Sequence, residues 1–168
     1  LPGETRYWRI TLPDDLPIAL KDGRKIHANI WASCLEHGIA AIGFEDDTED
    51  FQVQKFMEIE TGDKVVAFLR NRTIGGLGTV TAPYDPDIFE DKPAEQDYWH
   101  GKFWFRISVD WTPVTMSTKD LPQNVANKFL GQTVLELDRE DYEVVVGTVG
   151  LKSKSEVDTH SIVETFPG

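Results

Sequence analysis

The stretch FWFRISVDW, residues 103–111, carries the clearest structural pattern in the sequence. Apolar residues stand at every second position of this stretch, with Arg106, Ser108 and Asp110 between them. Successive side chains of a β-strand point to opposite faces, so this period of two predicts a strand with one face in a hydrophobic core. The fold is therefore expected to be organised around a β-sheet.

Two further strands are expected before this one, joined as a hairpin. Residues 64–69, KVVAFL, are almost continuously apolar, and a turn leads from them into a second strand over residues 74–81. Gly75, Gly76 and Gly78 lie in that second strand, where glycine permits a bulge or the close approach of another group. A phosphate-binding glycine loop would instead lie between a strand and a helix. We interpret these glycines as a bend in a curved sheet.

Weaker patterns describe the rest of the chain. Residues 7–11 are β-prone and end at a turn over residues 13–17. Residues 30–42 carry apolar side chains at roughly helical spacing after Asn29, which can cap a helix. The second half is expected to add a weak helix over residues 121–130, a short strand over residues 133–135 and a helix that begins at Asp138. Together these elements predict an α+β fold, a small and mostly antiparallel β-barrel flanked by helices.

Length and composition indicate one globular domain. The chain has 168 residues, 40% of them hydrophobic and 27% charged, and no apolar run reaches the roughly 18 residues that cross a bilayer. We expect a recognition domain over residues 1–150, a polar tail or linker over residues 151–168, and no membrane segment. A secretory signal is not expected and Cys34 is the single cysteine, so the expected compartment is the prokaryotic cytosol.

The net charge of −12 argues against tight binding to phosphates, because proteins that bind nucleic acid normally present a basic face. The charge is uneven, however. Residues 45–50 form an acidic block, whereas Arg70, Arg72 and Lys102 lie in or beside aromatic segments. These three residues are the candidates for contacts with phosphate.

The sequence offers no recognisable catalytic constellation. A nucleophile needs an adjacent base, and a lone Cys34 near His37 is more typical of core packing. Pairs of Cys and His at zinc spacing are absent from the sequence. We therefore expect a binding domain without catalytic activity, metal or cofactor.

Two of the five tryptophans stand outside the expected strands. Trp31 follows a helix cap, and Trp99 ends a polar loop, both of which are places that tend to lie at the rim of a barrel. Two aromatic faces around a small space can hold a flat base between them. Trp31 and Trp99 are therefore candidate walls of a base pocket, whereas Trp8, Trp104 and Trp111 are expected in the core.

The residues around these two tryptophans resemble the YTH domain family, readers of N6-methyladenine, and more loosely the EVE and PUA-like superfamily. IWASCLEHG at residues 30–38 resembles the segment that holds the family's first cage tryptophan. QDYWHGKF at residues 96–103 resembles a second signature, and KDLP at residues 119–122 resembles the family's Lys-Asp-Val-Pro. The resemblance covers roughly residues 7–146.

The resemblance implies roles for individual residues. Trp31 and Trp99 would sandwich the base, and the backbone of Ala32, next to Ser33, would contact its edge. The third cage wall of the family falls near Ala94, which is not aromatic. The side chains that would replace it are Tyr98, Phe89 or Tyr84. The polar side chains that would read a ring nitrogen are Asn29, Asp14 or Asp15.

The function implied by the resemblance is recognition of a flipped methylated base in DNA, with N6-methyladenine favoured over 5-methylcytosine. Similar folds serve as target-recognition modules of McrB-type modification-dependent restriction systems, where a nucleotide-driven motor follows and a nuclease subunit assists. The chain has no Gly-x-x-x-x-Gly-Lys-[Ser/Thr] loop, so it would be the reader alone. Two alternatives remain open: a reader of methylated RNA or tRNA, and a PUA-like small-ligand or protein-interaction domain that binds no nucleic acid.

Overall fold

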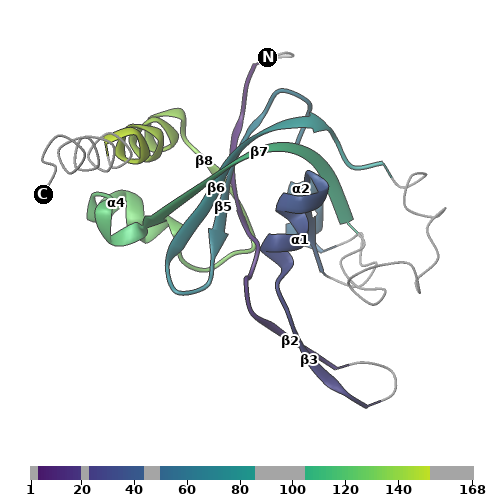
Figure 1. Cartoon of the computed structure of the whole chain (residues 1–168). Helices are drawn as coiled ribbons and strands as arrows, with labels where there is room; N and C mark the ends of the chain where they lie inside the picture. The colour runs from purple at the N-terminus through teal and green to yellow at the C-terminus, as the bar shows by residue number, and fades with distance from the viewer. Residues whose placement is uncertain (1–3, 20–22, 44–49, 86–104, 152–168) are drawn as a thin grey trace, which may run out of the picture.

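The computed structural model describes residues 4–19, 23–43, 50–85 and 105–151 and has an α+β fold (Figure 1). Trp104, the acidic residues 45–49 and the tail after residue 151, for which the sequence made predictions, lie outside these residues. The boundary of the recognition domain at residue 150 therefore stays a prediction. None of the helices in the described part is long and apolar enough to cross a membrane.

Strands and short helices are interspersed along the chain. In order they are β1 (Tyr7–Thr11), β2 (Leu16–Ala19), β3 (Lys25–Ala28), α1 (Ile30–His37), β4 (Ile39–Ile42), α2 (Phe51–Met57), β5 (Lys64–Leu69), β6 (Thr73–Ala82), β7 (Phe105–Ser117), η3 (Thr118–Asp120), α4 (Gln123–Ala126), η4 (Asn127–Phe129) and β8 (Val134–Leu137). A C-terminal helix then occupies residues 139–151 of the described chain.

Six strands form one strongly curved sheet in the order β4-β7-β6-β5-β1-β8, while β2 and β3 form a separate hairpin. All neighbours in the large sheet are antiparallel except β1 and β5, which run parallel. The expected class, a curved and mostly antiparallel sheet flanked by helices, is confirmed. The sheet stays open, with β4 and β8 as its edges.

The glycines of β6 coincide with the irregular part of the sheet. The pairing of β6 with β7 shifts register between Ile74 and Gly76, and the pairing of β5 with β6 shifts between Ala67 and Phe68. Extra residues of this kind bend a strand and increase its twist. The interpretation of Gly75 and Gly76 as a bend is confirmed.

Buried hydrophobic side chains form a layer on each side of the sheet, and helices lie over both sides (Figure 1). The first is covered by α1 and α2 and contains Trp8, Phe56 and Trp111. The second is covered by α4, η4 and the C-terminal helix and contains Phe129 and Val145. In β7 the predicted alternation is observed, since its buried side chains on the first layer are Phe105, Ile107, Val109 and Trp111.

The helix expected over residues 30–42 is shorter than predicted. It ends at His37 because Gly38 adopts the left-handed conformation (φ 65°), and its amide donates to the carbonyl of Cys34. Residues 39–42 then form β4, which pairs with β7. The prediction of helix up to Ile42 was wrong, because apolar side chains at every position fit a buried strand as well as a helix.

The β2–β3 hairpin and helix α2 were not predicted from the sequence. The hairpin begins at Leu16, inside the turn expected over residues 13–17, and extends away from the body of the molecule (Figure 1). Helix α2 follows Asp50, whose side chain accepts a hydrogen bond from the amide of Gln52 and caps the helix.

Candidate nucleic-acid interface

The start of α1 is tied to the segment that follows β1. The carbonyl of Pro13 accepts hydrogen bonds from the amides of Ile30 (2.9 Å) and Trp31 (3.2 Å). Asp14 directly follows Pro13 and is therefore held at this end of the helix. The structure thus places Asp14 next to Pro13, whose carbonyl binds the amide of Trp31.

The indole of Trp31 is seated on the glycines of β6. A Cβ atom at Gly76 would lie 2.5 Å from Cη2 of Trp31, and one at Gly75 would lie 2.9 Å from its Nε1. The ring meets Trp111 edge to face, with centroids 4.9 Å apart and an interplanar angle of 87°. Trp31 is only 8% exposed, so its orientation is set by packing rather than by solvent.

The three polar candidates for reading the base differ in what they already bind. The side chain of Asn29 accepts from the amide of Ala32 at 2.9 Å and caps α1. Asp15 lies 2.7 Å from Nδ1 of His27 in an exposed hydrogen bond. Oδ1 of Asp14, in contrast, is buried and has no hydrogen-bond partner. A buried acceptor without a partner costs about 1–3 kcal/mol, so Asp14 is the candidate with an unused acceptor.

The backbone of Ala32 is less available than the resemblance implies. Its amide already donates to Asn29, and the amide of Ser33 donates to the carbonyl of Asn29 at 3.3 Å. A base edge that approached the Ala32 amide would have to share or replace the cap. The side chain of Ala32 is exposed and that of Ser33 is half-buried.

Two of the predicted phosphate contacts lie in the tight turn between β5 and β6. Arg70 and Arg72 are both exposed, and the turn over residues 70–72 is closed by the positive φ angles of Asn71 (64°) and Arg72 (57°). The neighbouring Leu69 packs close to Gly75, where the nitrogen edge of Trp31 also lies. The turn therefore lies between Leu69 and Gly75, which are close to each other in the hairpin.

The remaining candidates divide between the core and the undescribed segment. Tyr84 is half-buried and packs on Phe105, with ring centroids 5.5 Å apart. Four predicted residues lie outside the described part of the chain, namely Phe89, Tyr98, Trp99 and Lys102. The second and third walls of the cage therefore stay predictions.

Cys34 is a core residue. It is fully buried in α1, and burial raises the pKa of its thiol to about 12. Because the thiolate is the reactive form, this cysteine is chemically quiet near neutral pH.

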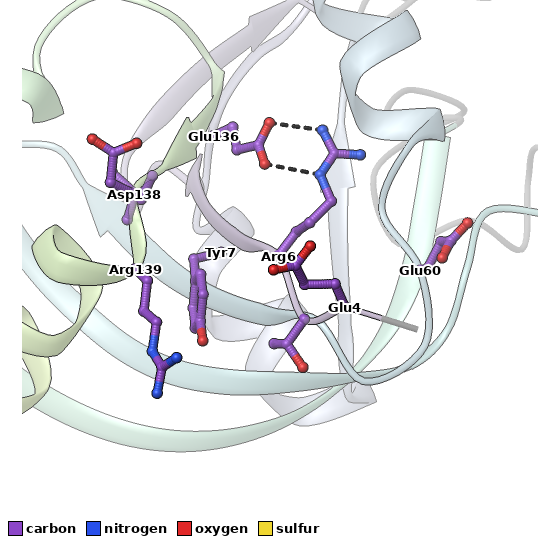
Figure 2. A pocket seen from close by; sticks show the side chains of 9 residues that line it. Glu4, Arg6, Tyr7, Glu60, Glu136, Asp138 and Arg139 are labelled. Carbon is purple, nitrogen blue, oxygen red and sulfur yellow. Dashed lines mark hydrogen bonds and ion pairs between the residues drawn. The ribbon is translucent and has the colours of Figure 1, made fainter. Parts of the chain in front are cut away.

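A hollow of about 870 Å³ lies at another part of the molecule, between the start of β1 and the end of β8 (Figure 2). Arg6 makes a two-pronged ion pair with Glu136 there, with Nε and Nη2 at 2.8 and 2.7 Å from the carboxylate oxygens. The hydrogen bond from Arg6 lowers the pKa of Glu136. Among the residues that the structure describes, none of the base-binding candidates lines this polar hollow.

The structure also reveals a buried carboxylate that the sequence analysis did not single out. Asp63 is 3% exposed and accepts hydrogen bonds from Nε1 of Trp8 (3.0 Å) and from the amides of Glu60 (3.0 Å) and Arg6 (3.1 Å). Two of these donors, Arg6 and Trp8, lie just before and within β1, so Asp63 joins β1 to the start of β5. In the sequence, the only indication of this buried role is that Asp63 stands directly before an apolar strand.

Comparison with known proteins identifies the fold. No protein-family model matches the sequence, and no curated protein matches it significantly. The YTH domain of Zygosaccharomyces rouxii MRB1, solved in complex with N6-methyladenosine RNA, is 12% identical with a TM-score of 0.56, and the match covers 88% of both chains. The Pho92 YTH domain in complex with m6A is 12% identical with a TM-score of 0.55, covering 89% of this chain and 85% of that one.

A bacterial protein has a similar structure. Rpa0253 from Rhodopseudomonas palustris is 16% identical with a TM-score of 0.52, and the match covers 88% of this chain and 94% of that one. At these identities the likeness concerns the fold alone. The curved sheet with α1 and α2 on one side and the C-terminal helix on the other is therefore a YTH-like fold.

Proposed function

We propose that this chain is a non-catalytic reader that takes one methylated base of a nucleic acid into a pocket beside Trp31, with DNA and N6-methyladenine as its preferred target. One observation carries the proposal. In a YTH-like fold, the start of α1 combines an aromatic ring held by packing with a buried carboxylate oxygen that has no partner. The two YTH domains named above were solved with N6-methyladenosine RNA and with m6A.

Stacking supplies the binding energy in this proposal. Trp31 forms one wall and Trp99 the opposite wall, while Tyr98, Phe89 or Tyr84 closes the third side. Extruding a base costs a few kcal/mol, and stacking on aromatic rings is worth about 1–3 kcal/mol per base. A methyl group adds apolar surface to the stacked ring, so it increases the net gain.

Asp14 supplies selectivity for the edge of the base. An ionised carboxylate accepts hydrogen bonds and donates none. It therefore pairs with the exocyclic N–H that N6-methyladenine retains, and not with an unprotonated ring nitrogen. This pairing would satisfy Oδ1 of Asp14, which has no partner in the free protein.

Contacts with phosphate come from Arg70 and Arg72 in the exposed turn and from Lys102. Such a small basic set on a chain of charge −12 gives weak binding outside the pocket. This charge suits a target-recognition module of a McrB-type restriction system in the cytoplasm, in which a fused motor and a nuclease subunit provide further contacts.

The test is a titration of the chain with matched duplexes that carry N6-methyladenine, 5-methylcytosine or no modification, and with the RNA equivalents. Asp14→Ala should weaken binding of the N6-methyladenine duplex by about tenfold, which corresponds to one hydrogen bond to a charged group. Asp15→Ala is the matched control, because it removes a neighbouring carboxylate that already has His27 as partner. Equal binding of modified and unmodified oligonucleotides would refute the reader.

The same titration separates the alternatives. Because one solved neighbour holds N6-methyladenosine RNA, tighter binding to methylated RNA than to DNA would assign the chain to RNA. If the chain bound none of the oligonucleotides, the remaining alternative would be a PUA-like small-ligand or protein-interaction domain that binds no nucleic acid.

A further inference from the structure

The hairpin of β2 and β3 is a two-stranded ribbon that extends from the body next to α1 (Figure 1). Its strands pair antiparallel from Leu16 opposite Ala28 to Ala19 opposite Lys25. Leu16 and Ala28 pack on the hydrophobic layer under α1, so the ribbon is anchored at its base. The remaining pairs lie farther from the body.

The two faces of the ribbon differ. Lys25 and His27 share one face because they are two residues apart, and both are exposed. Their cross-strand partners on that face, Ala19 and Pro17, are also exposed and are short. The opposite face carries half-buried Ile26 and Ala28. The exposed face therefore combines the positive charge of Lys25 with small side chains that allow close approach to another surface, while His27 on this face lies 2.7 Å from the carboxylate of Asp15.

The charge of the ribbon is opposite to that of the chain. The described residues of the hairpin, 16–19 and 23–28, include Arg24 and Lys25 and no Asp or Glu, whereas the whole chain carries −12. The ribbon is also continuous with the site described above, because Ala28 is followed by Asn29, the cap of α1, and then by Trp31. A polyanion that enters the site would therefore pass along a locally basic ribbon.

We propose that the β2–β3 ribbon lies in a groove of the nucleic-acid duplex that flanks the extruded base, with Lys25 on a phosphate. This inference rests on the proposed function. Four residues per strand extend about 13 Å at about 3.3 Å per residue. The major groove of B-DNA is about 12 Å wide and about 8.5 Å deep, and it admits a two-stranded ribbon.

The test compares a duplex that carries N6-methyladenine with the same methylated strand alone, since the single strand has no groove. The wild-type chain is measured beside Lys25→Ala, Lys25→Arg and the control Arg139→Ala, which removes an exposed positive charge from the C-terminal helix. Each phosphate contact contributes about 0.9 to the slope of log affinity against log salt concentration. Loss of one such contact should therefore lower the affinity about eightfold at 0.1 M salt.

Lys25→Ala should weaken duplex binding about eightfold and lower the salt slope by about 0.9, with single-strand binding within about twofold of wild type. Lys25→Arg should keep the duplex affinity, and Arg139→Ala should leave it unchanged. An unchanged duplex affinity in Lys25→Ala would overturn the groove contact, as would an equal loss on both substrates. A wild-type chain that binds neither substrate would overturn the proposed function itself, which is a different result.

Discussion

Substitution of Gly76 by alanine tests how Trp31 is held in place. The added Cβ would lie 2.5 Å from Cη2 and 2.8 Å from Cζ2 of Trp31, and 3.3 Å from Cε3 of Trp111. Ordinary contact begins at 3.4 Å, so the edge of the indole must move by about 1 Å in a closely packed interior. Overpacking of this kind costs about 1–3 kcal/mol.

This free-energy loss should be visible in thermal unfolding. For a domain of this size, each kcal/mol lowers Tm by about 2–4 °C, so Gly76→Ala should lower it by about 2–12 °C. Gly147→Ala is the matched control, because a Cβ there meets nothing within 4 Å and the residue lies in the C-terminal helix. That change should stabilise the protein by about 0.5–1 kcal/mol.

A double-mutant cycle assigns the loss to the ring of Trp31. The shorter ring in Trp31→Phe should relieve the clash, so Gly76→Ala should cost about 1 kcal/mol less in that background. An equal cost in both backgrounds would refute the idea that Gly76 provides the space for the indole. If Trp31 is also a wall of the base pocket, Gly76→Ala should reduce the preference for methylated DNA, whereas Gly147→Ala should not.

Two further predictions concern the carboxylates beside β1. Asp63→Ala leaves the donors of Trp8, Glu60 and Arg6 without an acceptor, and at about 1–3 kcal/mol per unsatisfied donor it should lower the free energy of unfolding by at least about 3 kcal/mol. Denaturant titration measures this loss, and a value below about 1 kcal/mol would contradict the role of Asp63. Glu136→Gln should cost less than about 1 kcal/mol, because the ion pair with Arg6 is partly exposed. Since the pKa of Glu136 is lowered from 4.5 in the folded state, its contribution is present above pH 4.5 and is lost as the pH falls through the lower folded value. A difference between wild type and Glu136→Gln that grows on acidification would have the wrong sign.

The parts of the fold that were predicted correctly have local and repetitive patterns. The alternation in β7 and the apolar run of β5 reflect burial on one or both faces, which is encoded at neighbouring positions. β4 was taken for helix because residues 39–42 are all apolar, and only pairing with β7 distinguishes the two. The β2–β3 ribbon was not predicted, because Pro17 and the adjacent turn residues are typical of irregular chain.

The sequence by itself determined the strands of the curved sheet and the cap at Asn29, since these depend on residues close together in the chain. Only the tertiary structure decided that Trp31 rests on Gly76 and that Asp14 is left with an unused acceptor. Both facts depend on contacts between segments that are distant in the sequence. The space around one residue and its hydrogen-bond partners are then set by residues that a local sequence pattern does not identify.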